Sequence, residues 1–215
     1  MGKVIAAAAM SLDGFVADTS DAVGPLFDWY GNGDVEITGA DPDRVFRVTE
    51  ATAGYLRATW TNIGAAVIGR HLFDLTNGWD GRPAIGDAVF VVTHRAPAGW
   101  PFPGAPYTFV TDGLPSAIAQ ARAFAGDRDV SLTAGNLTGQ AIAAGLVDEV
   151  SVSLVPVIFG SGVRFFGDYA GSPVLLDNPQ VVRGDRVTHL HYRVRQPGTA
   201  GGPTAPARSG GSASR

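Results

Sequence analysis

Several predicted strands end in residues whose types could hold a ligand. The apolar run Val4–Met10 leads into Asp13, which puts a carboxylate where open α/β sheets bind ligands. Gly69-Arg70 follows the strand predicted over Ala65–Ile68 and offers backbone donors together with a guanidinium. The alternatives are an Asx turn at Asp13 and a surface arginine at a tight turn, and the short motifs do not decide between them.

A third strand, predicted over Ala88–Thr93, ends in a hydroxyl, an imidazole and a guanidinium, those of Thr93, His94 and Arg95. Arginine donates bidentate, charge-assisted hydrogen bonds to phosphate oxygens, so these groups suit a terminal phosphate monoester. The alternative is that they are only the polar residues with which a strand reaches solvent.

A glycine turn, Ala134-Gly135-Asn136, separates the predicted strand Val130–Thr133 from a short apolar helix. The strand Glu149–Val157 follows, so this segment is predicted to be a βαβ unit. Such a turn presents free backbone N–H groups at the positive end of a helix dipole and can hold a phosphate. The dinucleotide fingerprint GxGxxG is absent, and a purely structural turn remains the alternative. The unit predicts a nucleotide-binding α/β domain.

Glycine, proline and periodicity predict the elements that connect these strands. Ser11–Ala40 is expected to be a long irregular loop, of the kind that is usually functional or disordered. A helix is expected to begin at Asp41-Pro42 and to end near Asn62. A second helix is predicted over Arg70–Thr76 and a third over Leu114–Ala125. Gly160-Ser161-Gly162 either approaches a ligand through its backbone or starts a strand.

The C-terminal part is expected to form an antiparallel hairpin at the edge of the sheet. Val174–Arg183 and Arg186–Arg195 flank Gly184-Asp185, which has the composition of a type II′ turn. His189 and His191 share one face of the second strand, and an exposed strand face is a better interpretation than a metal site. No metal site is predicted.

Composition excludes several classes of function. The 215 residues are 45% hydrophobic and 17% charged, which describes a globular protein. Sixteen Lys and Arg against 20 Asp and Glu give a net charge of −4, which argues against nucleic acid or an anionic membrane as partner. The absence of cysteine excludes disulfides and thiolate chemistry and favours the cytosol. No stretch is long and apolar enough to span a bilayer.

Taken in order, these motifs resemble the dihydrofolate reductase-like superfamily, and most closely the reductase domain of the riboflavin-biosynthesis bifunctional deaminase-reductase. The similarity runs over most of residues 3–195 and rests on SLDGF, IGR, VVTH, the glycine turn with GLVDE, and VPVIFGSG. It implies a three-layer α/β fold, with a mainly parallel central sheet and an antiparallel C-terminal hairpin, over residues 1–196. Residues 197–215 are expected to be a flexible Gly/Ser/Pro/Ala tail. A cytoplasmic homodimer that uses NADPH as hydride donor is the expected form.

The resemblance also implies roles for individual residues. The cofactor phosphates would meet Gly69 and Arg70, the adenosine 2′-phosphate would lie near Thr93, His94 and Arg95, and the pyrophosphate would rest on Gly135, Asn136 and Leu137. Asp13 would face the nicotinamide and the substrate as an orienting group or proton donor, in a pocket lined by Ala9, Phe15 and Trp29. The Ser11–Ala40 loop would act as a lid that excludes water. The substrate would be a small pterin, pyrimidine or ribitylaminopyrimidine-like molecule, as for 5-amino-6-(5-phosphoribosylamino)uracil reductase.

Two departures from the family pattern keep other functions open. Ala134 stands where the family usually has glycine, and Leu72 stands where many members have a threonine. A zinc deaminase domain is not part of this sequence, so a role in riboflavin synthesis would cover the reductase step alone. The alternatives are a nucleotide-binding paralogue without catalysis, which Ala134 favours, and a structural or interaction module, which predicts no cofactor binding.

Overall fold

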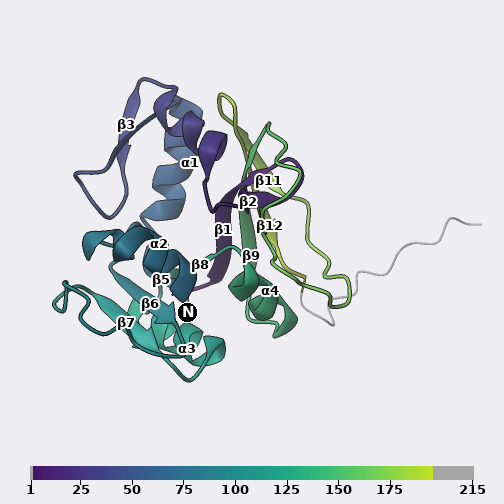
Figure 1. Cartoon of the computed structure of the whole chain (residues 1–215). Coiled ribbons are helices and arrows are strands. Elements are labelled where there is room, and N and C mark those ends of the chain that lie inside the picture. Colours follow the sequence, from purple (N-terminus) through teal and green to yellow (C-terminus); the bar gives the residue numbers. More distant parts are fainter. Residues whose placement is uncertain (1, 196–215) are drawn as a thin grey trace, which may run out of the picture.

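An eight-stranded sheet forms the centre of the molecule, as a computed structural model shows for residues 2–195 (Figure 1). The strand order is β11-β12-β9-β1-β8-β5-β6-β7. The six strands from β9 to β7 run parallel, whereas at the opposite edge β12 is antiparallel to β9 and β11 is antiparallel to β12. The prediction of a mainly parallel sheet with an antiparallel C-terminal hairpin is therefore confirmed. The predicted tail lies outside the described residues.

The strands of this sheet are short and mostly apolar. Their bounds are β1 Val4–Ser11, β5 Ile63–Gly69, β6 Ala88–Val92, β7 Tyr107–Val110, β8 Asp129–Thr133, β9 Glu149–Val155, β11 Gln180–Arg183 and β12 Thr188–Arg193. Two small antiparallel pairs lie outside it, formed by β2 Phe15–Ala17 with β10 Val163–Arg164 and by β3 Val35–Thr38 with β4 Val45–Val48.

Helices cover both faces of the sheet, which gives three layers. One face packs against α3 (Leu114–Ala125) and α4 (Asn136–Ala143), and the other against α1 (Glu50–Trp60), α2 (Arg70–Asp80) and the 3₁₀ helix η1 (Gly24–Gly31). Side chains that alternate along β5 join both layers, because Val67 packs with α3 whereas Ile68 packs with Phe73 of α2. Among the described residues, no helix has the length and apolar character needed to cross a membrane.

Helix α1 begins later than the sequence pattern predicted. Asp41 is not its N-cap, because a strand, β4, lies between Asp41 and the helix. The cap is Thr49, whose side chain accepts the N–H of Thr52 at 3.4 Å. Val45 and Val48 fit helical spacing, but β-branched residues beside Phe46 also favour a strand, and pairing with β3 decided the outcome. The helix predicted over Leu114–Ala125 is confirmed. The helix predicted over Arg70–Thr76 is also confirmed, because the left-handed backbone angles in α2 begin only at Asn77.

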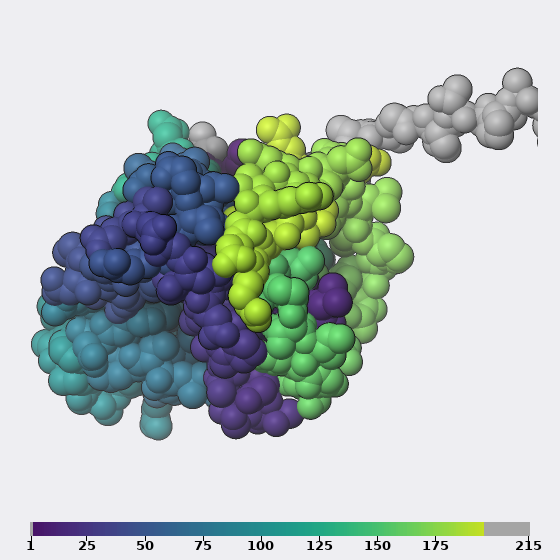
Figure 2. Space-filling model, turned by 90° about the horizontal axis from the view of Figure 1, so that it is seen from above, coloured from purple at the N-terminus to yellow at the C-terminus, as the bar shows by residue number. Residues whose placement is uncertain are grey.

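The segment Ser11–Ala40 is not an irregular loop, because it contains β2, η1 and β3. Figure 2 shows it in purple to indigo, running across the molecule between the blue and teal half and the green and yellow half. Trp29 is buried, Tyr30 is partly buried, and their ring centroids stack 3.9 Å apart, so η1 is anchored in the core. A lid that includes these aromatic residues would have to break that packing.

The terminal hairpin differs from its prediction in its turn and in its exposure. Arg183 pairs with Thr188, so four residues form the loop, and the positive φ falls at Arg186 (55°) rather than at Gly184. The prediction of a two-residue type II′ turn is wrong. The histidine face of β12 is also not exposed, because His189 has 0% exposure beneath α1 and η1.

Candidate functional site

The turns singled out in the sequence meet at one edge of the sheet. Strands β1, β8, β5 and β6 are consecutive neighbours and parallel, so their carboxyl ends lie side by side (Figure 1). Asp13, Gly135 and Thr93 follow the ends of β1, β8 and β6, and Gly69 is the last residue of β5. A Cβ added at Gly69 would lie 3.5 Å from the Leu137 side chain, which shows how closely two of the turns approach each other. This edge is where open parallel sheets bind ligands.

Arg70 connects the turns after β5 and β6. Its Nη1 donates to the carbonyl of Arg95 at 2.8 Å, and its Nε donates to both carboxylate oxygens of Asp74 at 2.7 and 2.9 Å. The hydroxyl of Thr93 also donates to the Arg95 carbonyl, at 2.8 Å. Because the Arg95 carbonyl accepts from both Arg70 and Thr93, the backbone at residues 93–95 is fixed relative to the β5–α2 turn.

His94 and Arg95, which adjoin this hydrogen-bonded frame, are exposed. Within residues 2–195 no carboxylate pairs with the Arg95 guanidinium. An unpaired arginine beside a fixed turn is available to an anionic ligand.

The turn at Gly135 has a backbone that favours glycine and a partner that covers part of it. Gly135 has φ +102° and ψ −155°, and a Cβ there would contact nothing within 4 Å. Its N–H donates to the carbonyl of Phe165 at 2.8 Å, and the Asn136 side chain accepts the N–H of Asp168 at 3.2 Å. Residues 165–168 therefore already bind one backbone donor and one side chain of the predicted phosphate cradle.

The start of α4 keeps further donors for an anion. Asn136, Leu137 and Thr138 form its first turn, and the N–H groups of a first helical turn have no acceptor within the helix. The N-cap, Gly135, makes no side-chain capping bond. The helix dipole adds partial positive charge at this end, so a phosphate group fits the chemistry of the turn. A cavity of about 290 Å³ borders Asn136 and continues along α4 toward Tyr169.

Asp13 is held at the end of β1 by hydrogen bonds to both of its carboxylate oxygens. One oxygen accepts from the hydroxyl of Ser11 at 2.6 Å and from the N–H of Phe159 at 3.1 Å, and the other accepts from the N–H of Gly160 at 2.7 Å. These bonds, that of Ser11 foremost, lower the pKa of Asp13 below its ordinary value of 3.8. Asp13 is therefore ionised at neutral pH, which suits an orienting group better than a proton donor.

The three residues predicted to line the substrate pocket differ in their surroundings. Ala9 lies partly buried on the sheet face that carries α1, and Phe15 is buried two residues beyond Asp13. Trp29 is 1% exposed and its indole N–H donates to the carbonyl of Leu26 at 2.8 Å. The structure thus keeps Trp29 in the core and does not bring it to an open surface beside Asp13.

Sequence reasoning missed the residues that support Asp13. Ser11 is fully buried and its hydroxyl accepts the N–H of Phe15 at 2.9 Å while it donates to Asp13. In the turn Gly160-Ser161-Gly162, the N–H of Gly160 donates to Asp13, and β10 begins directly after the turn. A Cβ at Gly162 would lie 2.1 Å from the carbonyl of Ala17, so the turn passes close to β2. Both elements belong to motifs quoted above, but only pairing of distant segments reveals their contacts.

An exposed contact between a histidine and an aspartate joins the first loop to α2. His71 Nε2 lies 3.0 Å from Asp21 Oδ2, at the start of α2 and therefore beside Arg70. Asp18 holds the Asp21 loop together, since its carboxylate accepts from the N–H groups of Ser20 and Ala22 at 2.7 and 3.0 Å. The residues from Asp18 to Ala22 thus reach across the carboxyl edge of the sheet.

A second polar group, centred on His189, lies beneath α1 and was not anticipated. His189 Nδ1 lies 2.9 Å from the Ser153 hydroxyl and Nε2 lies 3.2 Å from that of Thr52, with the ring stacked on Tyr55 at 4.5 Å. Burial lowers the pKa of His189 to about 4, so the ring is neutral at physiological pH. No group of three or more metal-ligating side chains is found in residues 2–195.

Comparison with known proteins identifies the fold. No family model and no curated protein matches the chain. Among solved structures, a putative riboflavin biosynthesis protein from Shewanella sp. PV-4 superimposes with a TM-score of 0.65 at 22% identity, over 90% of this chain and 99% of the other. The deaminase/5-amino-6-(5-phosphoribosylamino)uracil reductase of Thermotoga maritima gives 0.58 at 15%, over 90% of this chain and 57% of that chain. Dihydrofolate reductase from Enterococcus faecalis, solved with NADP(H), gives 0.55 at 15%, over 91% and 98%.

The identities are low, so these similarities bear on architecture rather than on activity. The chain has a dihydrofolate reductase-like fold that resembles the reductase domain of the riboflavin-biosynthesis deaminase-reductase.

Proposed function

We propose that this protein is an NADPH-dependent reductase that transfers hydride to a C=N or C=O carbon of a small pterin-, pyrimidine- or ribitylaminopyrimidine-like substrate. The observation that carries the proposal is the meeting of three turns, at Gly69, Thr93 and Gly135, along one edge of neighbouring parallel strands. Two arginines accompany them, of which Arg70 is fixed to the Arg95 carbonyl at 2.8 Å.

The residues of this edge fit a dinucleotide phosphate. The first-turn N–H groups of α4 and the open space around Gly135 suit a pyrophosphate, which needs backbone donors and close approach. Thr93, His94 and Arg95 suit a terminal phosphate monoester, because Arg95 is exposed and its guanidinium pairs with no carboxylate of residues 2–195. Nicotinamide, when bound, supplies the hydride; the protein supplies position and charge.

Asp13 would orient the substrate or a water molecule rather than give up its own proton. Its carboxylate is ionised at neutral pH and is fixed by three hydrogen-bond donors. A carboxylate fixed in this way accepts hydrogen bonds from ring N–H groups of a pterin or pyrimidine. A water molecule near it would then protonate the anion that forms as the double bond is reduced.

The test is fluorescence titration of NADPH and NADH into the wild type and into Arg70→Ala, Arg95→Ala and the control Arg183→Ala on β11. Arg95→Ala should lower the affinity for NADPH about tenfold or more and leave the affinity for NADH unchanged, because only NADPH carries the 2′-phosphate. Arg70→Ala should lower the affinity for both nucleotides. Unchanged affinity in both variants would remove the site assignment, and a loss in Arg183→Ala would mean that the effect is not local.

A second candidate function is nucleotide binding without catalysis. It is favoured by Ala134, which stands where relatives of this fold usually have glycine. NADPH binding with no turnover on panels of pterins, pyrimidines and quinones would support it. Turnover with any member of these panels would exclude it.

A further inference from the structure

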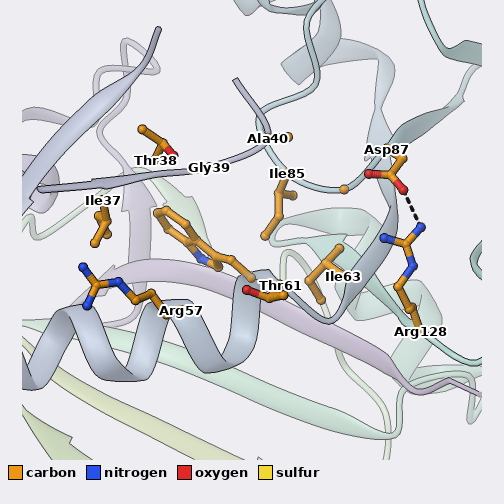
Figure 3. Close-up of a pocket in the computed structure, with 12 residues that line it drawn as sticks. Ile37, Thr38, Gly39, Ala40, Arg57, Thr61, Ile63, Ile85, Asp87 and Arg128 are labelled. Carbon is orange, nitrogen blue, oxygen red and sulfur yellow. Dashed lines mark hydrogen bonds and ion pairs between the residues drawn. The ribbon is translucent and has the colours of Figure 1, made fainter. Parts of the chain in front are cut away.

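Figure 3 shows a cavity of about 220 Å³. It lies at the amino edge of the sheet, on the far side from the turns described above. It is bounded by the end of α1, by β3 and the residues after it, and by the starts of β5 and β6. Ile63 and Gly69 are the two ends of β5, so roughly 20 Å of strand separates the cavity from the cofactor edge. We propose that this cavity binds a small planar aromatic carboxylate.

One part of the cavity wall is apolar and suits a flat ring, whereas threonine and charged side chains form the rest of the lining. Ile37 and Ile63 are 5% exposed, and Ile85 and the partly buried indole of Trp60 complete the wall. The chain passes close by at Gly39, where a Cβ would lie 2.8 Å from the carbonyl of Ala84 and 3.9 Å from the Trp60 ring. Trp60 also packs on Phe46, with ring centroids 5.9 Å apart, so its orientation is fixed.

The volume limits the ligand to one or two fused rings. The cavity volume equals the volume that about seven water molecules occupy in the liquid, at roughly 30 Å³ each. It is below the range of pockets that bind drug-sized molecules. A dinucleotide does not fit in this space. The cavity is therefore a site for a separate, smaller molecule.

Two arginines stand at opposite ends of the cavity, and their electrostatic states differ (Figure 3). Arg128 forms an ion pair with Asp87, which neutralises it. Arg57 donates only to the backbone carbonyl of Glu36, at 3.3 Å, and pairs with no carboxylate in residues 2–195. The Glu36 carboxylate pairs with Arg47 instead. The lining thus carries one positive charge that no carboxylate of residues 2–195 neutralises.

That charge selects a monoanion of planar geometry. A guanidinium binds a carboxylate through two parallel hydrogen bonds, and Arg57 has donors left for both. The cavity lies at the C-terminal end of α1, where the partial negative charge of the helix dipole disfavours any anion, and a phosphate dianion more than a monoanion. A carboxylate on an aromatic ring would offset this cost at Arg57 and would place its ring against Trp60 and the isoleucines.

Isothermal titration calorimetry with naphthalene-2-carboxylate and its neutral carboxamide tests the proposal. We expect saturable binding of the carboxylate that is about tenfold or more tighter than binding of the amide, which has the same ring. Arg57→Gln should remove this preference, whereas the control Arg183→Gln on the far edge of the sheet should keep it. Arg57 is exposed, so its replacement should leave the fold intact.

A third titration separates this site from the proposed cofactor site. Saturating NADPH should leave carboxylate binding unchanged, and Arg57→Gln should leave NADPH affinity unchanged. The proposal is overturned if the carboxylate does not bind, if carboxylate and amide bind equally, if Arg57→Gln retains the preference, or if NADPH displaces the ligand. Failure of NADPH to bind would instead count against the proposed function alone.

Discussion

The carboxylate of Asp13 accepts the backbone N–H of Gly160 at 2.7 Å, across 147 positions of the chain. This bond ties the end of β1 to the turn that follows β9. Asp13→Asn should release that turn, because both carboxylate oxygens accept N–H groups and an amide nitrogen cannot. We expect amide hydrogen exchange at Phe159 and Gly160 to become about tenfold or more faster.

The matched control is Asp34→Asn, which removes an exposed carboxylate far from this turn along the chain. The pKa of Asp13 is lowered from 3.8 in the folded protein, so its contribution to stability is fully present above that value and is lost as pH falls below it. Wild-type exchange at the two amides should therefore accelerate below about pH 3.8, beyond the intrinsic pH dependence. Equal exchange in wild type and Asp13→Asn would show that the carboxylate does not hold the turn.

The sequence predicted that glycine turns follow the parallel strands, because each of these turns depends only on a few adjacent residues. Gly69-Arg70 and Ala134-Gly135-Asn136 lie directly after apolar strands, and parallel strands carry their ends to one edge. The predicted helix over Leu114–Ala125 was also correct, since proline and glycine mark its two ends. These features depend on a few adjacent residues.

Features that depend on distant pairing could not be predicted. The strand β4 exists because β3 lies opposite it, although its residues also fit a helix. His189 is buried because α1 and η1 cover its face of β12, which periodicity along β12 alone cannot show. The support of Asp13 by Phe159 and Gly160 likewise joins segments that lie 146 and 147 positions apart in the chain.

Gly135→Ala should destabilise the fold and weaken nucleotide binding. The residue has φ +102° and ψ −155°, a region that is almost restricted to glycine, so the strain should cost about 1–3 kcal/mol. The space around its Cβ is open, so the loss would come from the backbone and not from a clash. Urea denaturation measures the stability, and NADPH titration should show an affinity about tenfold lower.

Gly54→Ala is the control for this change. Gly54 lies inside α1, a Cβ there also meets nothing within 4 Å, and alanine favours a helix by about 0.5–1 kcal/mol over glycine. It should be neutral or stabilising. A Gly135→Ala protein as stable as wild type would show that the turn tolerates a side chain.

The contact of His71 with Asp21 should slow the release of a bound nucleotide. It joins the first loop to α2 beside Arg70, so breaking it should let that loop open more often. His71→Gln and Asp21→Asn should each speed NADPH dissociation about two- to fivefold in stopped-flow measurements, because exposed ion pairs are weak. The double variant should match the single ones, and multiplicative effects would mean that the two residues act independently.

His189 should make stability depend on pH in the mildly acidic range. Its pKa falls to about 4 in the folded protein, below an ordinary value of 6.5, so the unfolded chain binds more protons between these values. Its contribution is therefore fully present above pH 6.5 and is lost progressively as pH falls toward 4. The loss between pH 7.5 and pH 5 should be about 2 kcal/mol.

His189→Gln isolates this contribution, because glutamine can hydrogen-bond with the hydroxyls of Thr52 and Ser153 and does not titrate. Urea denaturation at pH 7.5, 6.5, 5.5 and 5.0 should give a markedly flatter pH dependence for this variant than for wild type. His94→Gln, which removes an exposed imidazole, should keep the wild-type slope. If His189→Gln also keeps that slope, the buried ring is not the group that the acid protonates, and carboxylates such as Glu149, whose ion pairs with Lys3 and His191 lower its pKa, must account for the loss.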